Sequence, residues 1–133
     1  MDKKDVVFKL ETINLDRVRL DVTDKANFEN LEFSVELGYK EEEKDYLEKS
    51  LVNLRVHILG GMEGAPVDVI LYSTISVSKN DQPYIEFVEA YMNELAKPIL
   101  NKASALISNL YSDVRMLPTI IDLYSEYFSA IKE

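Results

Sequence analysis

The feature that most constrains this chain is an apolar repeat in its last fifty residues. Between 84 and 111, apolar residues recur at steps of three, four or seven, which places them on one face of a helix about 25 residues long. A second apolar row runs beside the first, so the apolar sector is wider than one contact surface requires. We therefore predict a helix that packs one side on the protein's own sheet and presents another to a second copy of the chain. The residues predicted to lie between copies are Tyr91, Leu95, Ile99, Leu106 and Leu110.

Two prolines divide this region. Pro98 lacks a backbone N–H and crowds the preceding turn, so we predict a kink or a restart of the helix over 96–98. Pro118 restricts Leu117 to extended geometry, and the apolar spacing from 120 to 131 then predicts a short final helix. Because a helix of about three turns is marginal on its own, this one is expected to dock on the rest of the fold.

The first part of the chain alternates apolar and polar residues, which is typical of half-buried strands. The phase of the alternation slips twice within the first strand, which predicts bulges or a bend there. Four strands followed by two helices predict an α+β fold, with a four-stranded antiparallel sheet followed by a long kinked helix and a short C-terminal helix packed on one face. We expect one domain over 1–133. The predicted strands cover 6–22, 31–39, 52–58 and 67–77, joined by a polar connection at 23–30 and a charged, solvated loop at 40–50.

Composition excludes several classes of function. The net charge is -9 and there is no basic stripe, so nucleic acid and anionic membranes are unsuitable partners. The absence of cysteine excludes disulfides and thiolate metal sites. Residues 1–10 lack the apolar run of a signal peptide, and no segment is long and apolar enough to span a bilayer. We therefore expect a cytoplasmic protein without membrane insertion.

The sequence offers little for catalysis. His57 is the single histidine, and mid-strand it is interpreted as a residue of the polar sheet face rather than a catalytic or metal-binding group. The glycines of 60–64 lack the Lys-Ser/Thr of a phosphate-binding loop, so they predict a hairpin and no nucleotide site. The paired carboxylates lie on predicted solvated surfaces, where nothing raises a pKa. We expect a binding protein with no enzyme activity and no cofactor or metal.

The order of these elements in an acidic chain resembles the SecB-like family of export chaperones. Pro118, Ile121 and Asp122 stand where that family has a loop proline, an aromatic residue and an aspartate, so Ile121 departs from the pattern. Segment 53–58 resembles the family's third strand, and the helix around Pro98 resembles its first helix. The resemblance implies a homotetramer built as a dimer of dimers, with first strands paired and long helices between the dimers. It also implies unfolded polypeptide clients, bound without ATP and passed to the translocase ATPase.

Pattern and resemblance together predict client grooves between the strand connection and the last helix. Phe28 is the best candidate, because a lone aromatic in a polar connection has little reason to serve a core. For Ile120 and Ile121, ordinary core packing is an equal alternative. The predicted peptide-binding residues are Phe28, Tyr72, Leu117, Ile120, Ile121 and Tyr124.

Outward acidic residues of the sheet contact the translocase ATPase in the SecB-like family. Asp21 and Asp68 hold such positions here, and Arg17 stands where another acid is expected. Three further interpretations stay open. The first is a SecB-like chaperone of an antitoxin or another dedicated client. The second is a carrier in which the helix closes a cavity over the sheet around a small apolar ligand. The third is a structural adaptor subunit.

Overall fold

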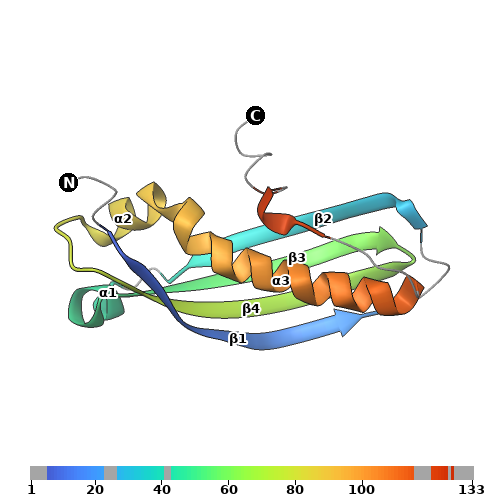
Figure 1. Ribbon diagram of the computed structural model, residues 1–133, viewed down its shortest axis with the longest axis horizontal. Helices are drawn as coiled ribbons and strands as arrows, with labels where there is room; N and C mark the ends of the chain where they lie inside the picture. The colour runs from blue at the N-terminus through green and yellow to red at the C-terminus, as the bar shows by residue number, and fades with distance from the viewer. Residues whose placement is uncertain (1–5, 23–26, 41–42, 116–120, 126, 128–133) are drawn as a thin grey trace.

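Four strands and three helices make up the described part of the chain, shown as a ribbon in Figure 1. The computed structural model describes residues 6–22, 27–40, 43–115, 121–125 and 127. The strands form one antiparallel sheet in the order β1-β4-β3-β2, so β1 and β2 are its edges. Helices α2 and α3 lie across one face of it (Figure 1). The predicted α+β architecture is confirmed. The elements are β1 (Phe8–Leu20), β2 (Asn27–Tyr39), α1 (Lys44–Lys49), β3 (Leu51–Glu63), β4 (Ala65–Val77), α2 (Tyr84–Ala90) and α3 (Met92–Arg115).

The predicted phase slips in the first strand are confirmed as register shifts. Pairing of β1 with β4 shifts between Leu10 and Thr12 and again between Leu15 and Arg17. Each shift returns apolar side chains to the face of the sheet that carries the helices, because residues paired across antiparallel strands point to the same side. The apolar β1 residues that pair in this way with buried residues of β4 are Phe8, Leu10, Ile13, Leu15, Val18 and Leu20.

The predicted restart of the helix over 96–98 is wrong. The helical path breaks at Tyr91, whose φ of -113° and ψ of 20° are not helical, and Pro98 lies inside the continuous helix α3. Leu95 and Ile99 lie on either side of the proline and are fully buried, so packing on the sheet supports α3 on both sides of it. The break instead separates α2, over one end of the sheet, from α3, whose greater part covers a second core cluster.

The charged run 40–50 is not only a loop, because it contains α1. Tyr46 anchors this helix: its side chain is buried, and its ring lies 5.2 Å from that of Tyr84 and 5.5 Å from that of Phe87. The Tyr46 hydroxyl is 2.9 Å from both Asn80 Oδ1 and the Gln82 carbonyl oxygen. Tyr46 therefore holds α1 against α2, although the charge pattern of 40–50 alone predicts a solvated loop.

Candidate functional site

A half-exposed apolar surface runs along the edge strand β2. Phe33, Val35 and Leu37 point to the helix side of the sheet, yet they are only partly buried, because α3 packs on β4, β1 and β3 and covers β2 less. Beyond α3 the structure describes 121–125 and 127, which we call the C-terminal segment. Its Tyr124 and Tyr127 are likewise partly exposed, and they pack against the core cluster between α3 and the sheet, as the three β2 residues do. We call these five residues the β2 stripe.

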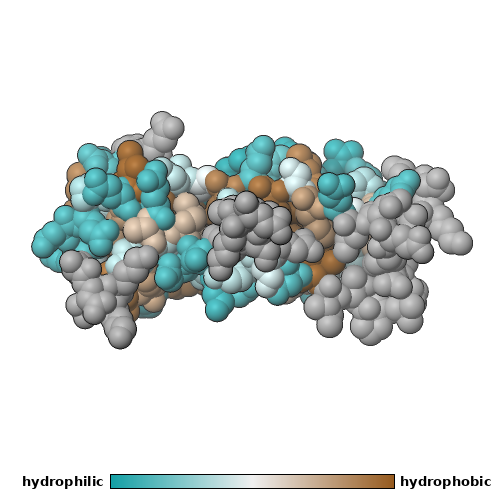
Figure 2. Space-filling model, turned by 90° about the horizontal axis from the view of Figure 1, so that it is seen from above, coloured by the Kyte–Doolittle hydropathy of each residue, from teal (hydrophilic) through white to brown (hydrophobic). Residues whose placement is uncertain are grey.

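Two serines of α3 position the C-terminal segment beside this stripe. The Ile121 N–H donates to Ser108 Oγ and the Leu123 N–H donates to Ser104 Oγ, each at 2.9 Å. Both serines lie on one flank of the helix, four residues apart. The segment thus lies beside α3, and in the view of Figure 1 it overlaps β2. Viewed from this side, apolar surface gathers around the middle of the molecule, while one end is mostly hydrophilic (Figure 2).

A second apolar surface lies at the opposite edge of the sheet. Leu10, Leu15 and Val18 of β1 face the helix side but remain 43%, 53% and 37% exposed. Leu106 and Leu110 of α3 are partly buried and lie two residues beyond Ser104 and Ser108, which on a helix is the opposite flank. We call Leu10, Leu15, Val18, Leu106 and Leu110 the β1 stripe.

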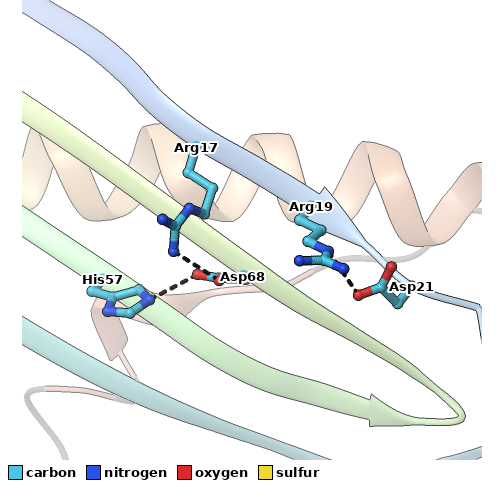
Figure 3. A network of polar contacts seen from close by, with 5 residues as sticks. All are labelled: Arg17, Arg19, Asp21, His57 and Asp68. Carbon is cyan, nitrogen blue, oxygen red and sulfur yellow. Dashed lines mark hydrogen bonds and ion pairs between the residues drawn. The ribbon is translucent and has the colours of Figure 1, made fainter.

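The sheet face without helices carries a polar network (Figure 3). His57 Nε2 donates to Asp68 Oδ1 at 2.7 Å, and Arg17 Nη1 donates to Asp68 Oδ2 at 3.2 Å. The His57 hydrogen bond, together with Arg17, holds the pKa of Asp68 below its ordinary value. Arg19 Nε lies 3.0 Å from Asp21 Oδ2. Each of the two acids therefore already has a basic partner in its own protomer.

Searches against known proteins find this architecture among solved structures. No protein-family model matches the chain, and no curated protein matches its sequence. Its structure is similar to the Mycobacterium tuberculosis Rv1957 SecB-like chaperone in complex with a ChAD peptide from the HigA1 antitoxin, with a TM-score of 0.62, 15% identity, and coverage of 87% of this chain and 86% of that one. The chain has a SecB-like fold. A Streptococcus agalactiae protein of unknown function is also similar, with a TM-score of 0.54, 12% identity, and coverage of 86% of this chain and 95% of that one.

The SecB-like fold does not bring the predicted peptide-binding residues together in one place. Tyr124 lies in the β2 stripe, whereas Tyr72 is 42% exposed on the other face of the sheet, between the buried Leu71 and Ser73. Ile121 is buried against the core. Leu117, Ile120 and the side chain of Phe28 lie outside the described residues. The backbone at Phe28 belongs to β2, which begins at Asn27, and not to the predicted polar connection.

Three of the five residues predicted to lie between copies occupy the core of the protomer. Tyr91, Leu95 and Ile99 are 1%, 0% and 0% exposed, so they have no surface left for a partner. Over 95–103 the two apolar rows of the helix merge into one buried sector, because the sheet lies beneath both. Leu106 and Leu110 remain partly exposed in the β1 stripe. Their contact with another copy stays a prediction.

The interior of the SecB-like fold is filled by side chains. Between α3 and the sheet, fully buried residues such as Val56, Ile58 and Leu100 pack into one cluster. Such packing is unfavourable for a carrier that holds a small ligand between helix and sheet. Within the described ranges there is no group of three or more His, Cys, Asp or Glu residues that could hold a metal ion. None of the described helices is long and apolar enough to cross a membrane.

The sequence alone did not single out Phe33, Val35 and Leu37 as surface residues. Their alternation with polar neighbours predicts a strand with one apolar face, and such a face is normally assigned to the core. Only the order of the strands shows that this face lies at an edge. No local signal in the sequence reports that order.

Proposed function

We propose that this protein is an ATP-independent holdase chaperone that binds unfolded polypeptide on its apolar surface. The observation that carries the proposal is the β2 stripe: apolar side chains left half-exposed beside the free edge of β2 in a SecB-like fold. Apolar patches that persist on a folded protein mark interaction sites. The similar Rv1957 chaperone holds a peptide of an antitoxin, which supports a polypeptide as the occupant.

Free edge and apolar stripe recognise different properties of a client. The unpaired N–H and C=O groups of β2 bind an extended backbone irrespective of sequence. The stripe adds about 1.5 to 3 kcal/mol for each client side chain that it buries, before the cost of ordering the client. Several weak contacts of this kind on one assembly raise the overall affinity through effective concentration. Neither contribution needs nucleotide hydrolysis.

Replacing Tyr124 with serine is the direct test of the β2 stripe. We expect client affinity to fall about ten- to hundredfold, because one aromatic contact is removed. The measurement is suppression of light scattering by a refolding client at sub-stoichiometric chaperone. Leu47→Ser is the matched control, since Leu47 is a 67% exposed apolar residue on α1. Equal suppression by both variants and the unchanged protein would remove the stripe from client binding.

We further propose that the protein assembles through β1. This strand is an edge 13 residues long that exposes apolar side chains on the helix side, and such an edge favours pairing with another strand. The β1 stripe, which includes Leu106 and Leu110, then becomes buried between two copies. Pairing of first strands also agrees with the SecB-like resemblance, in which two such dimers form a tetramer.

Replacing Leu15 with lysine is expected to dissociate this assembly. A lysine at a buried position between copies leaves an unpaired charge, so the dimer loses several kcal/mol. Native mass spectrometry should then show the single chain of 15.3 kDa for Leu15→Lys and multiples of it for the unchanged protein. Leu47→Lys, at an exposed site on α1, should keep the larger mass. Retention of that mass by Leu15→Lys contradicts assembly through β1.

The clients we favour are dedicated ones, such as an antitoxin, over general export precursors. The SecB-like resemblance implies that the translocase ATPase contacts outward acidic residues of the sheet. Here Asp21 is paired with Arg19, and Asp68 is paired with Arg17 and His57. A paired acid presents less negative field to a basic partner. Transfer to the translocase and a cytoplasmic location stay predictions.

A further inference from the structure

Gly38 has no explanation within the fold. It lies inside β2, where a glycine costs about 0.5 to 1 kcal/mol relative to alanine. Strand glycines usually mark a bulge or a close approach of another group. Pairing of β2 with β3 is regular from Leu31 to Tyr39, so there is no bulge. The φ of Gly38 is not positive, and a Cβ built on it meets no atom within 4 Å.

The missing side chain opens a hollow on the sheet face away from the helices. Gly38 of β2, Arg55 of β3 and Tyr72 of β4 form one row across three strands. With Lys40 and Asn53 beside them, they line a hollow of about 300 Å³. Tyr72, 42% exposed, forms an aromatic wall. The hollow is separated from the β2 stripe by the sheet itself.

Arg55 gives this hollow its charge preference. Neighbouring groups are already engaged: Lys40 Nζ lies 3.5 Å from Asp45 Oδ2, and Asn53 Nδ2 donates to the same oxygen at 3.0 Å. Arg55 makes no ion pair with any residue that the structure describes. Arg55 is partly buried as a residue, and its guanidinium has a planar set of donors that matches a carboxylate.

We propose that this hollow receives an acidic side chain of a bound client strand. The inference rests on the proposed function, and it adds a charge preference at one defined position of the client. A strand added to the free edge of β2 places one residue directly opposite Gly38 and on the same face, with Cβ atoms about 5 Å apart in such pairs. Because Gly38 has no side chain, a glutamate there extends over it toward Arg55. Strand addition of this kind gives affinity through the backbone and specificity through alternate side chains.

The test uses a blocked peptide, acetyl-Thr-Val-Thr-Glu-Thr-Val-Thr-amide, and its counterpart with glutamine in place of glutamate. We expect the glutamate peptide to bind about tenfold more tightly, as one charge-assisted contact predicts. Amide chemical shifts of Gly38, Arg55 and Tyr72 should move on titration. Equal affinity for the two peptides overturns the proposal.

Gly38→Val provides an occlusion variant that should still fold. Valine suits a strand, and a Cβ at this position meets no atom within 4 Å. We expect it to abolish the preference for glutamate, whereas Ser34→Val, on the same strand and face, should keep it. A preference that persists in Gly38→Val overturns the proposal. Propionate that moves the same amide signals with an affinity equal to that of the peptide also overturns it, because the hollow is then a site for small anions.

Suppression of aggregation separates this inference from the proposed function. If the unchanged protein suppresses aggregation but shows no preference for the glutamate peptide, the holdase function stands and the acidic subsite is refuted. If it prefers the glutamate peptide but suppresses no aggregation, the subsite stands and the holdase function is refuted. Gly38→Val should retain suppression of a client whose strands lack acidic residues.

Discussion

Replacing Gly61 with alanine is expected to destabilise the protein by about 3 to 5 kcal/mol. Gly61 has a φ of +100°, where a side chain is strained. A Cβ at this position would lie 2.9 Å from Phe33 Cε1 and would overlap the hydroxyl of Tyr111. That hydroxyl accepts the Met62 N–H at 2.9 Å and donates to the Ala65 carbonyl at 2.8 Å. The alanine thus adds strain and displaces the contact that fastens the β3–β4 hairpin to α3.

Urea unfolding followed by far-ultraviolet circular dichroism measures this loss. Gly38→Ala is the matched control, because it is also a strand glycine but its Cβ meets open space; its stability should be unchanged or slightly raised. In a Tyr111→Phe background, Gly61→Ala should cost less, since the overlapping oxygen is gone. The prediction fails if Gly61→Ala and Gly38→Ala unfold at the same urea concentration.

Replacing Tyr91 with aspartate is expected to unfold the protomer. Tyr91 is 1% exposed, and its ring lies 4.8 Å from that of Phe87 and 5.5 Å from that of Phe8. Loss of a buried aromatic costs about 3 to 5 kcal/mol, and an unpaired carboxylate in the same place adds more. The sum approaches the whole stability of a typical domain, about 5 to 15 kcal/mol. Circular dichroism should show no cooperative thermal transition.

The same variant distinguishes a core residue from a residue between copies. Tyr91→Phe should remain folded, because the ring is kept, and Asn101→Asp should too, since Asn101 lies on the exposed face of α3. If Tyr91 lay between copies, Tyr91→Asp would instead give a folded protein of smaller mass. That outcome would show that Tyr91 lies between copies and not in the core of the protomer.

Strand identity and the bulges of β1 were accessible from sequence because both depend on local alternation. Leu10, Ile13 and Val18 mark the two phase slips, and a bulge follows directly from a slip. The position of the helix break could not be predicted from the sequence, because it depends on packing and not on a local pattern. Pro98 is the visible local signal, but burial of the surrounding residues holds the helix through it, and the break falls at Tyr91.

The candidate site could be predicted only in part from the sequence. Tyr124 was singled out by pattern and resemblance together and lies in the β2 stripe, while Tyr72 lies on the other face of the sheet, beside Gly38. Gly38 occupies an outward position in the alternation of β2, where nothing local distinguishes it. Its significance required knowing that no bulge, no positive φ and no neighbouring atom accounts for it.

The sequence by itself determined the four strands, the long helical region and the apolar faces of both, since these depend on periodicity over a few residues. The tertiary structure decided which apolar faces are covered. Strand order left β1 and β2 at the edges. The sheet buried most of the two apolar rows of α3 but left Leu106 and Leu110 partly exposed, and the acids of the open face received basic partners. Whether an apolar residue serves the core or a partner depends on contacts between segments distant in the sequence, and local periodicity carries no information about those contacts.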